Sequence, residues 1–85
     1  MRLDKYLKVS RLIKRRTVAK EMVDAGRVKI NGKIAKPGNE VSVGDELEIG
    51  FGRRMVRAKI EDIKDSVKAS EAAGLYSILE GTPID

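Results

Sequence analysis

The 85-residue sequence contains no cysteine, no histidine and no tryptophan, and only one phenylalanine and two tyrosines. The absence of cysteine excludes a disulfide framework and thiolate metal sites, and the absence of histidine removes the most common general base and metal ligand. No stretch approaches the roughly 20 apolar residues that a membrane-spanning helix needs. These absences predict a small soluble domain of the cytoplasm with an aliphatic core and no metal or cofactor site.

Acidic side chains are the main groups left for acid–base chemistry. Ten of the thirteen acidic residues follow Pro37, and they are scattered along the chain with no nucleophile beside them. An active site requires a nucleophile, a base and a stabilising group brought together, and the sequence offers no such set. The sequence therefore predicts that the chain is not an enzyme.

Positive charge is concentrated in the first part of the chain. Residues 1–36 contain twelve lysines and arginines against three acids, whereas residues 37–85 contain six basic residues against ten acids. The total is a formal net charge of +5. A domain with one basic end typically binds a polyanion, and nucleic acid is the first candidate.

Two short helices are predicted before Gly26. The first has an apolar face at helical spacing, formed by Leu3, Tyr6, Leu7 and Ser10. This spacing assigns Tyr6 to the core rather than to base stacking. The second helix is expected over residues 18–25, with Thr17 as its N-cap and Gly26 as the left-handed residue that ends it. The two helices form a helical hairpin with a basic connection.

Period-two alternation after Gly26 predicts strands. Val28 and Ile30 precede an Asn31-Gly32 hairpin turn, and Ile34 continues the returning strand. Further strands are expected at residues 41–43, 47–49 and 55–63, with a bend or bulge where two glycines flank Phe51. Residues 70–74 lean towards helix, and residues 75–79 are equally compatible with a strand that returns to the sheet.

An ordered set of motifs runs through these elements. It comprises Arg2-Leu3-Asp4-x-x-Leu7, Ser10-Arg11, Arg16-Thr17-x-Ala19, Gly26-Arg27-Val28-x-Ile30-Asn31-Gly32 and Val41-x-Val43-Gly44-Asp45-x-Leu47. Together these motifs resemble the S-four RNA-binding domain family. The resemblance implies an α+β fold with an N-terminal helical hairpin packed on a small, mostly antiparallel twisted sheet. It further implies one domain over residues 1–85, with the core motif in about 1–49 and a C-terminal strand and tail in 50–85.

The resemblance places the RNA-binding residues on the basic helical hairpin. Arg2 and Arg16 stand at motif positions, and arginine can bind phosphate in a bidentate fork; a salt bridge from Arg2 to Asp4 is the structural alternative. The other candidates are the remaining cations of this segment: Lys8, Lys14, Arg15, Lys20, Lys5 and Arg11. The later arginines 53, 54 and 57 are expected on a solvated loop and strand, and Arg27 and Lys29 on the exterior of a strand.

The opening residues and the ending Tyr76-x-Ile78-Leu79 are similar to the compact ribosome-associated quality-control P factors of Gram-positive bacteria. This resemblance implies a monomer that binds large ribosomal subunits stalled with peptidyl-tRNA. It would contact rRNA and the peptidyl-site tRNA, and it would assist an alanine-tailing quality-control factor.

Two other functions are weighed against this one. A heat-shock-type factor that recycles large subunits is disfavoured because the sequence has no basic extension after the domain. A helix-turn-helix DNA-binding protein is disfavoured because its second helix exposes Lys20, Glu21 and Asp24 rather than side chains that read bases.

Overall fold

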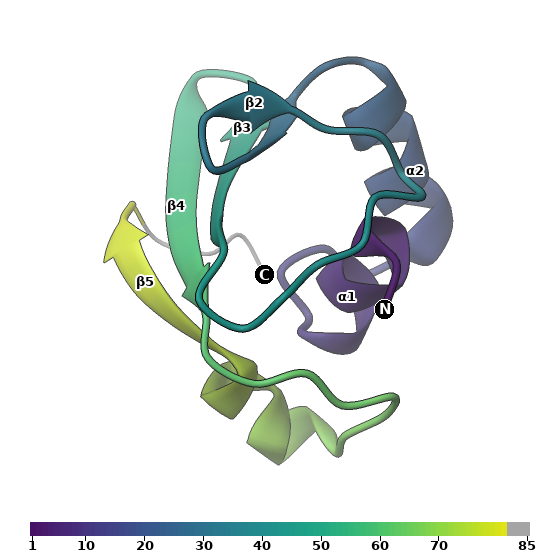
Figure 1. Ribbon diagram of the computed structural model, residues 1–85, viewed down its shortest axis with the longest axis vertical. Coiled ribbons are helices and arrows are strands. Elements are labelled where there is room, and N and C mark those ends of the chain that lie inside the picture. Colours follow the sequence, from purple (N-terminus) through teal and green to yellow (C-terminus); the bar gives the residue numbers. More distant parts are fainter. Residues whose placement is uncertain (82–85) are drawn as a thin grey trace.

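Two short helices lie against one side of an antiparallel five-stranded sheet in the computed structural model, which describes residues 1–81 (Figure 1). The elements in chain order are α1 (Leu3–Val9), α2 (Arg16–Asp24), β1 (Val28–Ile30), β2 (Lys33–Ile34), β3 (Glu46–Phe51), β4 (Arg54–Ile60), the 3₁₀ helix η1 (Ala69–Leu75) and β5 (Tyr76–Glu80). The sheet order is β2-β1-β3-β4-β5. This arrangement confirms the predicted α+β class.

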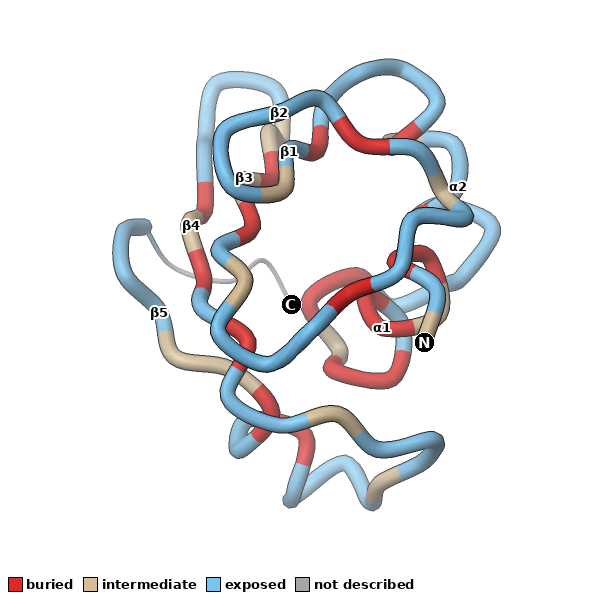
Figure 2. The backbone as a smooth tube through the Cα atoms, viewed as in Figure 1, coloured by how far each residue is buried: buried red, intermediate tan, exposed pale blue. Residues whose placement is uncertain are grey.

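The core forms between the helices and the inner face of the sheet. Leu3, Tyr6 and Leu7 of α1 are fully buried, as their spacing predicts. Inward-facing strand residues meet them, and in Figure 2 the buried segments follow α1, the turn after it and alternate positions of the strands. Phe51 packs against the edge of this core, so the only phenylalanine contributes to packing.

Helix α2 begins earlier than predicted. Its N-cap is Arg15 in an extended conformation, with no side-chain cap, and Thr17 is an exposed residue of the first turn. The prediction of Thr17 as N-cap is therefore wrong. The physical reason lies in the connection between the helices, where Leu12 and Ile13 are buried and fix the point at which the chain can turn into α2.

The strand register matches the predicted alternation. Val28 of β1 pairs with Ile49 of β3, which pairs with Val56 of β4, and all three side chains are buried. Asn31 and Gly32 both have positive φ, at 50° and 83°, as a two-residue hairpin turn of type I′ requires. The predicted hairpin is confirmed.

Three predicted details of the strands are wrong. Residues 41–43 form no strand, because the segment after β2 crosses the start of α1 instead (Figure 1). There Val41 is buried and donates its N–H to the Met1 carbonyl at 3.0 Å, while Val43 is exposed. The expected bend around Phe51 is a two-residue turn between β3 and β4, and β4 ends at Ile60 rather than at residue 63.

The C-terminal part closes the sheet. Helix η1 and strand β5 occupy the two segments for which helix and strand were considered, and β5 pairs with β4. The Tyr6 hydroxyl donates a hydrogen bond of 2.6 Å to the Leu75 carbonyl, which joins α1 to the end of η1. Burial raises the pKa of Tyr6, so the phenol stays protonated as a donor. The last four residues of the expected tail, 82–85, lie outside the described residues.

Candidate nucleic-acid interface

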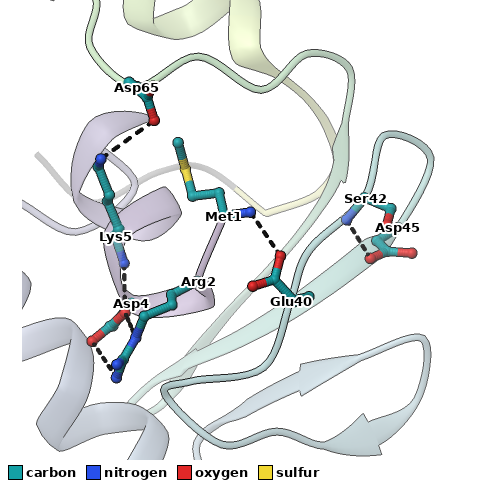
Figure 3. Close-up of polar contacts among 8 residues, drawn as sticks. All are labelled: Met1, Arg2, Asp4, Lys5, Glu40, Ser42, Asp45 and Asp65. Atoms are coloured by element: carbon teal, nitrogen blue, oxygen red, sulfur yellow. Dashed lines mark hydrogen bonds and ion pairs between the residues drawn. The ribbon is translucent and has the colours of Figure 1, made fainter.

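A buried carboxylate joins the two arginines that the motif singles out. Asp4 is only 3% exposed. Its Oδ1 accepts from the Arg2 Nε at 3.2 Å and from the Arg16 Nη2 at 3.4 Å, and its Oδ2 accepts from the Arg2 Nη2 at 3.4 Å. Figure 3 shows the Arg2 guanidinium turned onto the carboxylate. Asp4 therefore fixes the positions of one guanidinium from the start of α1 and another from the start of α2.

The loop after β2 anchors the main chain directly after Arg2. The N–H of Leu3 donates to the Asn39 carbonyl at 2.8 Å, and the N–H of Asp4 donates to the Pro37 carbonyl at 3.2 Å. The amino group of Met1 pairs with Glu40 at 2.8 Å (Figure 3). The N-terminus of α1 is thus anchored by main-chain bonds, which leaves the Arg2 side chain about half exposed.

The electrostatics of Asp4 follow from these contacts. Burial raises the pKa of Asp4, but the hydrogen bond from Arg16, the backbone N–H of Lys5 and the charges of Arg16 and Arg2 together outweigh burial and hold it below its ordinary value. The carboxylate stays ionised at neutral pH. Both guanidinium groups keep their charge and have N–H donors to spare, since arginine has five.

Four of the residues predicted to contact RNA have charged side chains without a partner in the described part of the chain. Lys8, Lys14, Arg15 and Lys20 are exposed, and none of their side chains has a hydrogen bond or ion pair within residues 1–81. Lys20 follows Arg16 by one helical turn on α2, so the two side chains lie on the same side of that helix. An unpaired lysine on the same side of α2 as a fixed guanidinium is an arrangement suited to phosphates.

Two other predicted contacts have structural partners. Arg11 donates to the carbonyls of Val9 at 2.7 Å and Val67 at 3.2 Å, and its backbone is left-handed with φ 63°. Lys5 pairs with exposed Asp65 at 3.4 Å (Figure 3). Both cations attach the segment between β4 and η1 to the first helix, a role that the sequence could not show.

Arg57 is also paired, on the outer face of the sheet. It lies 2.9 Å from Glu46, 3.7 Å from Glu48 and 3.3 Å from Glu80, which are carboxylates of β3 and β5. The hydrogen bonds that Arg57 donates to Glu80 and Glu46 raise its pKa. Arg57 serves cross-strand pairing, as its predicted place on a strand allows.

The described residues contain no group of three or more potential metal ligands. Within the same part of the chain, no helix is long and apolar enough to cross a membrane.

Comparison with known proteins identifies the family. Residues 1–47 match the S4 domain model, which is the S-four family of the motif. An "RQC P-site tRNA stabilizing factor" of Streptococcus pneumoniae (strain ATCC BAA-255 / R6) is 53% identical over 85 residues, which cover 100% of this chain and 97% of the relative. The chain belongs to this S4-domain family.

Further relatives of this S4-domain family agree. A protein of Bacillus subtilis (strain 168) with the same description is 55% identical over 80 residues, covering 94% of this chain and 93% of the relative. Heat Shock Protein 15 of Vibrio cholerae has the same fold, with a TM-score of 0.85 and 38% identity over 92% of this chain and 80% of that structure. The residues that match the S4 domain model include Arg2, Asp4 and Arg16 and the free cations, whereas β4, η1 and β5 follow them.

Proposed function

We propose that this chain is a non-catalytic RNA-binding protein of ribosome-associated quality control, which binds large ribosomal subunits and stabilises the peptidyl-site tRNA. The observation that carries the proposal is the pair of guanidiniums fixed by buried Asp4, with exposed Lys20 one helical turn after Arg16 on the same side of α2. Relatives described as stabilising P-site tRNA, which match over nearly the whole chain, supply the biological setting. We further propose that it acts as a cytoplasmic monomer.

The basic surface would act as a clamp. Lysines and arginines that neutralise phosphates release counterions, which gives affinity with little reading of sequence. Structured RNA is distinguished mainly by its shape and its 2′-hydroxyls, so two guanidiniums held at a fixed separation favour one backbone contour over others. Holding the tRNA raises the population of its reactive arrangement, and a partner factor would then add alanine residues to the stalled chain.

The test is binding of purified large subunits by Arg16→Ala, with Lys59→Ala as the control. Both changes remove one cation, but exposed Lys59 lies on β4 with no partner in residues 1–81. We expect Arg16→Ala to weaken binding about tenfold, the effect of losing one charge-assisted contact. Its melting temperature should change little, because Arg16 is about half exposed and buried Asp4 keeps its bonds to Arg2 and to the Lys5 N–H.

Four results would oppose the proposal. Equal affinities of Arg16→Ala and Lys59→Ala would show that the helical surface is not the binding site. A flat salt response would exclude a phosphate clamp, since six neutralised phosphates predict a slope of log K against log salt of about −4 to −5. Affinity capture from a bacterial lysate that recovers large subunits without an alanine-tailing factor would favour recycling of subunits, and recovery of DNA would exclude both functions.

A further inference from the structure

A second set of arginines lies at the other end of α2. Arg27 follows this helix, and its carbonyl accepts from the N–H of Gly50 at 2.8 Å. Gly50 belongs to the last part of β3, next to the two-residue turn that carries Arg53 and leads to Arg54. Arg27, Arg53 and Arg54, here called the distal arginines, therefore share one end of the sheet, although Arg27 is 26 or more residues from the other two in sequence.

The distal arginines are separated from Asp4 and its partners Arg2 and Arg16, here called the Asp4 cluster. Helix α2 has nine residues, so its axis is about 13 Å long. Arg16 stands at its first residue and Arg27 lies beyond its last. Figure 1 agrees: the connection between β3 and β4 lies at the upper left of the view, whereas the N-terminus, where α1 begins, lies at the right below the middle. One phosphate group cannot contact both sets.

The exposure of these side chains is typical of a binding surface. Arg27 and Arg53 are exposed, and their side chains have no hydrogen bond or ion pair within residues 1–81. Glu21 lines a hollow beside Arg27, together with Met22 and Ala25, but forms no ion pair with it. Arg57 lies close to Arg53 and Arg54 in sequence, but it is paired with carboxylates on the outer face of the sheet and does not belong to the distal arginines.

We propose that the distal arginines form a second RNA-binding site that takes the phosphate backbone of the tRNA, while the Asp4 cluster binds rRNA. The inference rests on the proposed function and adds to it a division of labour between the two ends of α2. A protein that stabilises a tRNA on a subunit must hold both RNAs at once. Two separate sites achieve this by making the second contact intramolecular.

The test uses purified large subunits that carry labelled deacylated tRNA at the peptidyl site. The variant is Arg27→Ala/Arg53→Ala, and the matched control is Lys59→Ala/Lys64→Ala, which removes the same charge elsewhere on the chain. Two quantities are measured for each protein: its affinity for the same subunits without tRNA, and the rate at which tRNA dissociates from the loaded subunits in its presence. Melting temperatures accompany both, because Arg27 also stands near the negative end of α2 and could stabilise that helix.

We expect the distal variant to bind subunits within about twofold of the wild type and to release tRNA about fivefold faster, as the loss of two phosphate contacts predicts. Arg27→Lys/Arg53→Lys should restore most of the retention, because the charge is kept. Equal losses in subunit affinity and tRNA retention would overturn the division into two sites. Unchanged tRNA release would overturn the distal site itself, while Arg16→Ala still tests the proposed function. Failure of the wild type to retain tRNA would refute both.

Discussion

Replacing Asp4 by asparagine separates two explanations of RNA binding that predict opposite signs. If total charge alone set the affinity, removing one negative charge from the basic surface would tighten binding. If the geometry of the arginines matters, the same change should weaken it, because the amide cannot hold two cations. We expect Asp4→Asn to weaken binding to large subunits about fivefold, less than Arg16→Ala, because both guanidiniums remain present but mobile.

The cost in stability follows from the same contacts. Each arginine pair involves a side chain that is about half exposed, 52% for Arg2 and 48% for Arg16, so each pair contributes about 0.5 kcal/mol. The hydrogen bond that the Lys5 N–H donates to the ionised Asp4 carboxylate, at 2.8 Å, contributes about 1 kcal/mol more to the free energy of unfolding. We expect a loss of about 2 kcal/mol, which lowers the melting temperature of a domain of this size by about 10 °C.

The control for this experiment is Asp24→Asn. Asp24 is exposed near the end of α2 and has no partner among residues 1–81, so this change adds the same charge without touching the arginines. Filter binding and thermal denaturation at neutral pH, well below both melting temperatures, measure the two effects separately. If Asp4→Asn binds as tightly as Asp24→Asn while folded, the positioning role of Asp4 is wrong.

Three other changes test the fold and its charges. Tyr6→Phe removes the donor to the Leu75 carbonyl and should lower the free energy of unfolding by about 1–2 kcal/mol in urea denaturation; no loss would mean that the bond is immaterial. Gly26→Val should cost about 1–2 kcal/mol from backbone strain alone, since φ is 75° and an added Cβ meets nothing within 4 Å; an unchanged melting temperature would contradict this. The pKa of Asp4 in the folded protein is below its ordinary value of 3.8, because the arginines favour the ionised form. The stability that Asp4 contributes is therefore fully present above pH 3.8 and is lost as the pH falls through the lower pKa of the folded state. Acid titration of unfolding should therefore show a smaller loss for Asp4→Asn than for the wild type, and parallel curves would oppose this assignment.

Local patterns predicted most of the fold. The apolar stripe of α1 and the Asn31-Gly32 turn depend on neighbours in sequence, and both are confirmed. Val41 misled the prediction because alternation of apolar residues does not distinguish a strand from a loop with one buried residue. Residues 41–43 form a loop because Val41 bonds to Met1 at the start of the chain, a contact between residues 40 positions apart.

The candidate site was predicted in composition but not in arrangement. Arg2 and Arg16 were named from the motif, and Asp4 was considered only as a neighbour of Arg2. The Asp4 carboxylate binds both arginines because α1 packs on α2. The spacing of residues within one helix does not reveal this packing. The one available signal was that Asp4 is the only acid among the first 20 residues. The roles of Lys5 and Arg11 required the position of residues 65–67, which lie beyond β4.

The bond from Tyr6 to Leu75 spans 69 positions of the chain and has a consequence for synthesis. Contacts of such long range close late in folding, because the intervening chain must first be brought together. On a translating ribosome, α1 cannot reach its final packing until η1 and β5 have left the exit tunnel. Arg2 and Asp4 lie at the start of α1, so their final packing waits until these later elements have emerged, and RNA binding by the finished site follows that step.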